Sequence, residues 1–370
     1  MNQHLTPTSL QFVKTKAAQK TPLSLSVELT ARCNNDCRHC YINRPAGDAD
    51  AMSRELSLAE WERIADMARD AGVLWCLISG GEPMLRPDFF DIYLMFKRKG
   101  FLITLFTNGT LLTEEAVAIL KQYPPYKIEV SVYGVTEETY VAVTGKPGYC
   151  ARMKEGIERL LQAGLYTCLK TPLIRSNQHE AEAIYDYCAP RTREPFRFDT
   201  ALHQRMDFDP DRNRMIYEER LTDDQVLNLE GLRPERIASL KEACENPKRK
   251  IYTNPETGKR PLFRCRAGSE SVTVDPYGRL RLCAMLSAPE FLYDLRNGTL
   301  EEAVGDFRTR ILSLPNENPK FEKCKTCRAI TLCNWCPGRA SLACGQADAF
   351  MPEICRVAEK RYDALMKGEV

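Results

Sequence analysis

The sequence predicts an α/β fold, a partial barrel of six strand–helix units followed by a small, cysteine-rich α+β domain. From residue 22 to about 200, short apolar runs rich in β-branched residues alternate with amphipathic helical stretches, a pattern typical of a parallel sheet covered by helices. Six units fit this length better than the eight of a closed TIM barrel. From residue 256 onward cysteines dominate. We therefore expect an N-terminal extension (1–21), a TIM-like partial barrel (22–205), a helical linker (206–255) and a cysteine-rich domain (256–370).

Six segments of the alternating region have the length and composition of buried strands. One helix between them starts at a capping box of Ser57 and Glu60 and ends at Gly72, and another carries an apolar stripe that begins at Met153 and Ile157. Parallel sheets of this kind place their chemistry at the carboxyl ends of the strands, so functional residues are expected just after each strand. The predicted strands are residues 23–29, 73–79, 101–106, 127–132, 167–171 and 196–201.

Beyond the barrel the alternation stops. Asp- and Arg-rich sequence leads into two predicted helices, one opened by a capping box of Thr222 and Gln225. Residues 271–274 and 280–283 predict a hairpin around a turn at 276–278. A further helix should follow Pro352, because proline suits the first helical position.

Composition narrows the class of protein. The chain has 370 residues, of which 44% are hydrophobic and 28% charged, and a formal net charge of +2. The hydrophobic content excludes a largely disordered chain, and the small net charge does not predict a nucleic-acid partner. The apolar runs are too short for a membrane span. The first residues lack the apolar stretch of a signal peptide, so we expect a cytoplasmic protein. The 16 cysteines are clustered, which in such a reducing compartment indicates metal binding or redox chemistry.

The first cysteine group follows directly on the first predicted strand. Cys33, Cys37 and Cys40 lie in one loop at the strand's carboxyl end. A [4Fe–4S] cluster normally takes four thiolates, so three would leave one iron open for a substrate or cofactor. A zinc site with a distant fourth ligand and a redox Cys-x-x-Cys motif remain alternatives.

This Cys-x3-Cys-x2-Cys loop, followed by the aromatic Tyr41, resembles that of the radical S-adenosylmethionine (SAM) superfamily. The second strand strengthens the resemblance, because it ends in Gly80-Gly81-Glu82-Pro83. The resemblance implies that this loop receives the amino group of the cofactor's methionine moiety. It also implies that SAM chelates the open iron and is split reductively to a 5′-deoxyadenosyl radical, which takes a hydrogen atom from the substrate.

Later strand ends hold the ribose and adenine in this superfamily. The resemblance therefore makes Thr107 and Asn108, after the third strand, and Ser131, after the fourth, candidate cofactor contacts. Ordinary turn and cap residues would have the same composition. His203, Asp199, Lys170, Tyr133 and Arg205 also lie near predicted strand ends, where each is as compatible with a structural role as with a functional one.

The C-terminal cysteines resemble the seven-cysteine SPASM extension, which holds two auxiliary [4Fe–4S] clusters. One departure is that two residues separate the third and fourth cysteines of the 324–336 run, where the family usually has three. A zinc ribbon is the alternative, but its Cys-x2-Cys pairs are usually farther apart. By resemblance Cys324, Cys327, Cys333 and Cys355 would hold an outer cluster, and Cys265, Cys283 and Cys336 an inner one.

The two motifs supply ten thiolates, whereas three clusters with one position given to SAM need eleven. Cys244 is a candidate for the missing ligand, although a buried helical thiol explains it equally simply. Cys344 could replace Cys355 as a ligand. Otherwise one auxiliary iron is open, and such an iron could bind a substrate thiol.

SPASM enzymes mostly act on peptides or proteins, and two details favour maturation of a ribosomally made peptide. Sulfatase-maturing members carry an aspartate base after the cysteine of the Gly-x4-Cys element, whereas Ala284 follows Cys283 here. The segment that begins at Cys336 is also closer to peptide maturases. The expected activity is an oxidation such as crosslinking. The alternatives are a sulfatase-maturase-like protein oxidase, a SPASM dehydrogenase for a small molecule or carbohydrate, and a non-enzymatic electron carrier.

The resemblance also implies partners. These are a precursor peptide and an electron donor such as flavodoxin or ferredoxin. Only about 20 residues precede the first predicted strand, whereas the leader-binding winged helix of many maturases has roughly 80. We therefore expect a separate leader-recognition protein or recognition by the surface of the barrel.

Overall fold

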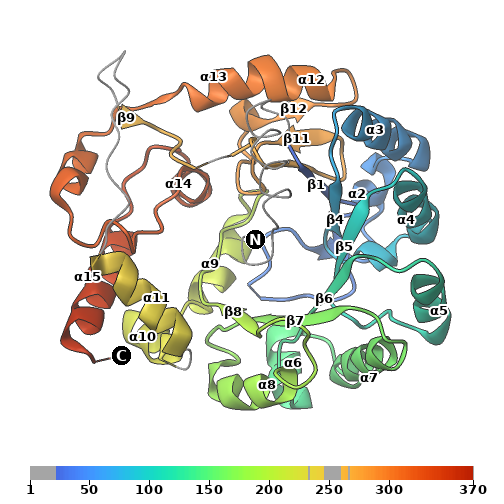
Figure 1. The fold of residues 1–370 in the computed structure, drawn as a ribbon, viewed down its shortest axis with the longest axis horizontal. Coiled ribbons are helices and arrows are strands. Elements are labelled where there is room, and N and C mark those ends of the chain that lie inside the picture. The colour runs from blue at the N-terminus through green and yellow to red at the C-terminus, as the bar shows by residue number, and fades with distance from the viewer. Residues whose placement is uncertain (1–21, 232–233, 246–259, 266, 370) are drawn as a thin grey trace.

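The computed structural model describes residues 22–231, 234–245, 260–265 and 267–369 (Figure 1). The predicted extension 1–21 lies outside this part of the chain. The main sheet has nine strands in the order β12-β11-β10-β1-β4-β5-β6-β7-β8. Its six consecutive parallel strands from β1 to β8 are those predicted from the sequence, with ends shifted by a few residues. Their bounds are β1 (Ser24–Glu28), β4 (Trp75–Ser79), β5 (Leu102–Thr107), β6 (Lys127–Ser131), β7 (Thr167–Pro172) and β8 (Arg197–Asp199).

Helices cover the outer face of this sheet, and their local signals are those of the sequence (Figure 1). The predicted capping box is present, since Ser57 and Glu60 exchange hydrogen bonds at the start of α3. In α7, Met153, Ile157 and Leu160 are buried against the sheet. The covering helices are α2 (Ala49–Arg54), α3 (Leu58–Asp70), α4 (Phe89–Arg98), α5 (Glu114–Gln122), α6 (Glu137–Thr144), α7 (Tyr149–Gln162) and α8 (Ala181–Cys188).

The predicted C-terminal hairpin forms, but it extends the barrel sheet. Strand β10 (Ser271–Val274) pairs in parallel with β1, so that Leu25 lies opposite Val272. Strands β11 (Arg279–Arg281) and β12 (Tyr293–Asp294) follow in antiparallel order. The cysteine-rich region and the barrel therefore share one sheet and one hydrophobic core.

Three helices follow β8 where two were expected. They are α9 (Pro210–Glu218), α10 (Asp223–Glu230) and α11 (Pro234–Glu245), and α10 begins at the predicted capping box of Thr222 and Gln225. The remaining elements are α12 (Leu300–Glu302), α13 (Arg308–Leu312), α14 (Pro337–Cys344), α15 (Pro352–Lys367), and the short strand pairs β2 (Arg32–Cys33) with β3 (Arg44–Pro45) and β9 (Arg260–Pro261) with β13 (Pro315–Asn316).

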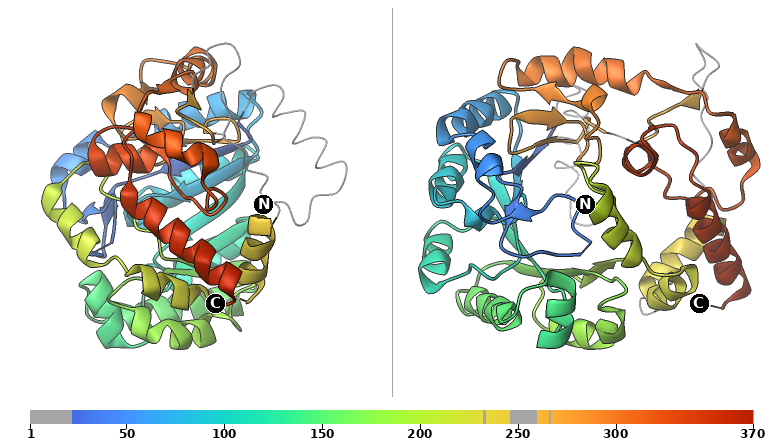
Figure 2. Two further views of the ribbon diagram at one scale, coloured as in Figure 1. Left: turned by 90° about the vertical axis from the view of Figure 1, so that its left-hand side faces the viewer. Right: turned by 180° about the vertical axis from the view of Figure 1, so that it is seen from behind.

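The C-terminal region connects the two edges of the main sheet. It leaves the β12 edge through α12 and α13 and returns through α14 to α15, which packs against α10 and α11 beyond the β8 edge (Figures 1 and 2). The carboxyl ends of the parallel barrel strands therefore face the C-terminal region. Among the described helices, none has both the length and the apolar composition needed to cross a bilayer.

Candidate functional site

The three-cysteine loop leaves the carboxyl end of β1 and is fixed at both ends. At its start the guanidinium of Arg32 binds the buried carboxylate of Glu55, with Nε 2.8 Å from Oε1. At its far end the guanidinium of Arg205 donates hydrogen bonds to the carbonyl oxygens of Cys40 and Asn43, at 3.3 and 3.1 Å. Arg205 is almost fully buried. Its role here is therefore to position the loop.

Except for Glu82 and Pro83, the predicted cofactor residues surround a single cavity of about 340 Å³, which we call the Cys33 cavity. Residues from the ends of five neighbouring strands, β1, β4, β5, β6 and β7, line it, as the topology of a parallel sheet requires. Of the predicted cofactor and ligand residues, the lining includes Cys33, Cys37, Cys40, Tyr41, Gly80, Gly81, Thr107, Asn108 and Ser131.

Glycine is required in the loop after β4 by a close approach to the start of the cysteine loop. A Cβ atom on Gly80 would lie 2.3 Å from the carbonyl oxygen of Thr30, and one on Gly81 would lie 2.2 Å from that of Arg32. Gly80 also has φ of +138°, a conformation that side chains disfavour. The two loops are thus locked together by backbone contact, since the N–H of Gly81 donates to the Thr30 carbonyl at 2.7 Å.

Glu82 and Pro83 do not line the Cys33 cavity. The Glu82 side chain is fully buried. Its carboxylate accepts hydrogen bonds from the Thr107 hydroxyl at 2.9 and 3.0 Å, from the backbone N–H of Asn108 at 2.8 Å and from that of Met84 at 3.2 Å. Burial raises the pKa of Glu82 to about 7. Glu82 therefore joins the glycine loop to the turn after β5, and the polar groups that face the cavity come from Thr107 and Asn108.

Two thiols of the loop, those of Cys33 and Cys37, sit in an environment that disfavours free thiolates. Burial, with smaller contributions from the negative charges of Glu82 and Cys40, raises the pKa of Cys33 to about 12. Burial likewise raises the pKa of Cys37 well above its ordinary value. Reactive redox cysteines have lowered pKa values, so these thiols do not fit that alternative. They fit ligands whose charge a bound iron cluster would neutralise.

Other side chains in the cavity extend the sequence-based set. Tyr133, Lys170 and His203 line it, as their positions near strand ends allowed. Burial lowers the pKa of Lys170 to about 8 and that of His203 to about 4. Asp199 borders a different cavity.

Two further cavity residues were not singled out from the sequence: Glu28 ends β1, and His39 lies inside the cysteine loop. Ala284, which follows Cys283 in the Gly-x4-Cys element, also lines the cavity. The side chain of Glu28 is buried and paired with Arg281 of β11. No local sequence pattern could reveal this pair, because it depends on β10 and β11 joining the barrel sheet.

The C-terminal cysteines fall into two groups in space. Cys283 is electrostatically coupled to Cys265 and Cys336, and both couplings raise the pKa of its thiol after the larger effect of burial. A second cavity, of about 150 Å³, brings residues of both groups together. Cys355 is coupled in the same way to the remaining group, which consists of Cys333, Cys324 and Cys327.

Cys244 and Cys344, the two other candidate ligands, have different surroundings. Cys244 packs in a small apolar cluster with Cys327 and Cys333, so it lies beside the second group. Cys344 is exposed at the end of α14.

Within the described residues, no three His, Cys, Asp or Glu side chains converge on a point suited to one metal ion. A four-iron cluster takes one thiolate per iron, so its ligands need not converge in this way.

Comparison with known proteins identifies the class of the barrel. Residues 27–188 match the sequence profile of the radical SAM superfamily. This range contains the cysteine loop, the glycine loop and the ends of β4, β5 and β6. The barrel region is thus similar to radical SAM proteins, a class that implies SAM and a [4Fe–4S] cluster as cofactors.

Individual relatives extend the similarity beyond the barrel. The chain is 26% identical over 274 residues to the antilisterial bacteriocin subtilosin biosynthesis protein AlbA of Bacillus subtilis, an alignment that covers 71% of this chain and 55% of AlbA. It is 34% identical over 170 residues to the AdoMet-dependent heme synthase of Methanosarcina barkeri, which covers 46% of this chain and 48% of that protein. The chain spans about half the length of the curated relatives it matches.

The fold as a whole is that of SuiB from Streptococcus suis. The structure of SuiB bound to S-adenosylmethionine superposes with a TM-score of 0.69 at 16% sequence identity, covering 96% of this chain and 84% of SuiB. SuiB has also been solved bound to precursor peptide SuiA. The similarity to SuiB extends through the cysteine-rich region, so both parts of the predicted architecture are present.

Proposed function

We propose that this protein is a radical SAM/SPASM enzyme that oxidatively matures a ribosomally made peptide. The observation that carries this proposal is that the three-cysteine loop, the glycine loop and the ends of β5 and β6 surround one cavity, while seven further cysteines form two groups in the C-terminal region. The similarity to AlbA and to SuiB favours a peptide substrate over a porphyrin or a nucleotide.

In this proposal residues 22–205 bind the cofactor, 206–255 form the linker and 256–370 carry the auxiliary clusters. Cys33, Cys37 and Cys40 would hold the first cluster. Gly80 and Gly81 let the backbone approach the cofactor closely, Thr107, Asn108 and Ser131 supply polar groups, and Tyr41 forms part of the wall. When bound, SAM and its cluster supply a 5′-deoxyadenosyl radical that abstracts hydrogen from the substrate.

The C-terminal thiols would hold two auxiliary clusters. Cys324, Cys327, Cys333 and Cys355 are assigned to the outer cluster, and Cys265, Cys283 and Cys336 to the inner one. Cys244 lies beside the outer group, which supports an open iron in the inner cluster over a fourth thiolate from Cys244.

Ala284 narrows the choice among the possible reactions. Ala284 lines the Cys33 cavity, at the position where the family resemblance puts the aspartate base of sulfatase maturases. A methyl group cannot accept a proton, which favours peptide crosslinking or a related oxidation over sulfatase maturation. The proposed partners are the precursor peptide, a separate leader-recognition protein and an electron donor such as flavodoxin or ferredoxin.

The test is co-expression with a short peptide encoded beside the gene, followed by anaerobic purification and mass spectrometry of the peptide. A crosslink or other oxidation removes two hydrogen atoms from the peptide, and its mass falls accordingly. Unchanged mass with an inverted stereocentre would indicate epimerisation. An unmodified peptide, with wild-type enzyme that carries all its clusters, would contradict the proposal.

A further inference from the structure

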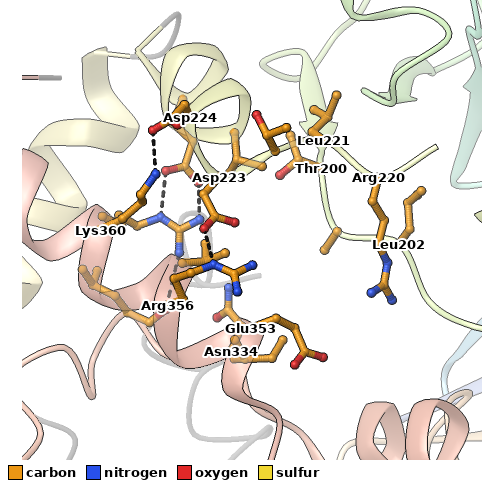
Figure 3. Close-up of a pocket in the computed structure, with 18 of the residues that line it drawn as sticks. Thr200, Leu202, Arg220, Leu221, Asp223, Asp224, Asn334, Glu353, Arg356 and Lys360 are labelled. Carbon is orange, nitrogen blue, oxygen red and sulfur yellow. Dashed lines mark hydrogen bonds and ion pairs between the residues drawn. The ribbon is translucent and has the colours of Figure 1, made fainter. Parts of the chain in front are cut away.

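A third cavity, of about 490 Å³, lies between the linker helix α10 and the C-terminal helix α15 (Figure 3). Ala201 and Leu202, which follow β8, line both this cavity and the Cys33 cavity. The two cavities are therefore neighbours that share this segment as a wall. A group held in the α10–α15 cavity would lie near the site where hydrogen would be abstracted.

Most charges of the α10–α15 cavity are already paired across the two helices. Arg356 binds Asp223 at 2.6 Å, and Lys360 binds Asp224 at 2.8 Å. Deeper in the cavity, Arg361 makes a bidentate pair with the buried carboxylate of Glu230. These contacts hold α15 against α10 and leave little charge free for a ligand.

Two arginines of the same cavity differ from the paired ones in having no carboxylate partner among the described residues. They are Arg220 and Arg339. Arg220 stacks on the ring of Tyr217 at 4.2 Å, and its guanidinium carries no polar contact in Figure 3.

Arg339 lies close to both Arg220 and the Cys33 cavity. Burial, with a further contribution from the charge of Arg220, lowers the pKa of Arg339. The charge of Arg339 in turn contributes to the lowered pKa of His203, which lines the Cys33 cavity. Two partly buried cations side by side are unfavourable without an anion. The negative charges of Asp199 and Glu353, which border the cavity, partly oppose the lowering of the Arg339 pKa, but neither carboxylate forms an ion pair with either arginine.

We propose that Arg220 and Arg339 bind a carboxylate of the peptide substrate, and so place the residues next to that carboxylate in the Cys33 cavity. The planar guanidinium group suits a carboxylate because two N–H groups can bind its two oxygens. The inference deepens the proposed function and rests on it. It predicts that the substrate carries an Asp or Glu side chain close to the residue that is modified.

The test measures binding alone, without reductant, so that it does not depend on turnover. The probes are two fluorescent pools of synthetic octapeptides, identical except for one internal position that is Glu in one pool and Gln in the other, with neutral residues elsewhere. Anaerobic, cluster-loaded protein should bind the Glu pool roughly tenfold more tightly, as a charge-assisted contact implies. The preference should weaken in Arg220→Gln and in Arg339→Gln and disappear in the double variant.

The matched control is the double variant Arg356→Gln/Asp223→Asn, which removes a paired cation from the same cavity without changing its net charge. It should keep the preference for the Glu pool. Iron content must stay unchanged in every variant, because Arg339 lies near Cys336. Equal binding of both pools, no binding of either, or a preference that survives Arg220→Gln/Arg339→Gln would overturn the inference. A peptide that is still modified in the co-expression experiment would then leave the proposed function standing.

Discussion

Gly81 shows how single residues set the cofactor site. Its backbone passes so close to Arg32 that a Cβ atom would lie 2.2 Å from that residue's carbonyl oxygen and 2.7 Å from that of Ala31. Both neighbours belong to the segment that carries the cysteine loop, so any added atom must displace that loop.

We expect Gly81→Ala to destabilise the protein by about 1–3 kcal/mol, the usual cost of overpacking, and to lower the iron content of the first cluster. Gly47→Ala is the control, because its Cβ would meet nothing within 4 Å. Denaturant unfolding and iron analysis under argon measure both effects. A Gly81→Ala protein as stable and as rich in iron as Gly47→Ala would show that the close approach has no such role.

Glu82 provides a second test of how a single residue stabilises the cofactor site. Its carboxylate accepts from three different residues, and the amide of Glu82→Gln would turn an N–H group toward one of these donors. The expected loss is about 1–3 kcal/mol of unfolding free energy. Glu62→Gln, which alters an exposed ion pair with Lys99, should cost less than about 1 kcal/mol. If the two variants lose the same amount, the buried hydrogen bonds of Glu82 contribute nothing specific.

Among the elements, the contact between β1 and the C-terminal hairpin includes one buried ion pair in addition to the β1–β10 strand pairing. Arg281 of β11 binds Glu28 of β1, and both side chains are almost fully buried. Burial raises the pKa of Glu28, and the charge of Arg281 opposes this shift. The pair therefore ties the cysteine-rich region to the barrel at the edge of the Cys33 cavity.

Removing one partner should leave an uncompensated buried charge. Arg281→Met is expected to cost about 3–5 kcal/mol of unfolding free energy. The double variant Glu28→Gln/Arg281→Met should recover part of this loss, because neither charge then remains. A double-mutant cycle by denaturant unfolding measures the coupling. Strictly additive losses would show that the two groups do not stabilise one another.

The two spatial groups of C-terminal cysteines predict separable metal losses. Three four-iron clusters would give about 12 irons per chain. Cys355→Ala should lose about four of them, from the outer cluster, while Cys344→Ala should lose none, because that thiol is exposed and has no place in either group. Iron and sulfide analysis after anaerobic reconstitution distinguishes these outcomes. A loss of iron from Cys344→Ala with retention in Cys355→Ala would reverse the assignment.

For the molecule as a whole, sequence patterns predicted the barrel well. The strands from β1 to β8 were found because each is a short apolar run followed by an amphipathic helix, and this pattern is local. The pairing of β10 with β1 left no such signal, since almost the entire barrel separates the two strands in sequence. A helix over the Asp- and Arg-rich sequence ahead of the two expected linker helices was also missed, because α9 is mostly polar and buries only Ile216.

In the candidate site, too, some features have a local sequence signal and others do not. Motif spacing located the cysteine and glycine loops, because close backbone approach and cluster ligation allow few residue types. It could not show that the Glu82 side chain is buried outside the lining of the Cys33 cavity, nor that Arg220 and Arg339 form no ion pair with a described carboxylate. Both facts depend on side chains that come from distant segments, and only the folded chain brings them together.

The most direct test of the whole account is reductive cleavage of SAM by the reconstituted protein. With dithionite and without oxygen, the wild-type chain should form 5′-deoxyadenosine and methionine in equal amounts, and Cys33→Ala should form neither while keeping the iron of the two C-terminal groups. Wild-type protein with its full iron content that neither binds nor cleaves SAM would contradict the central claim.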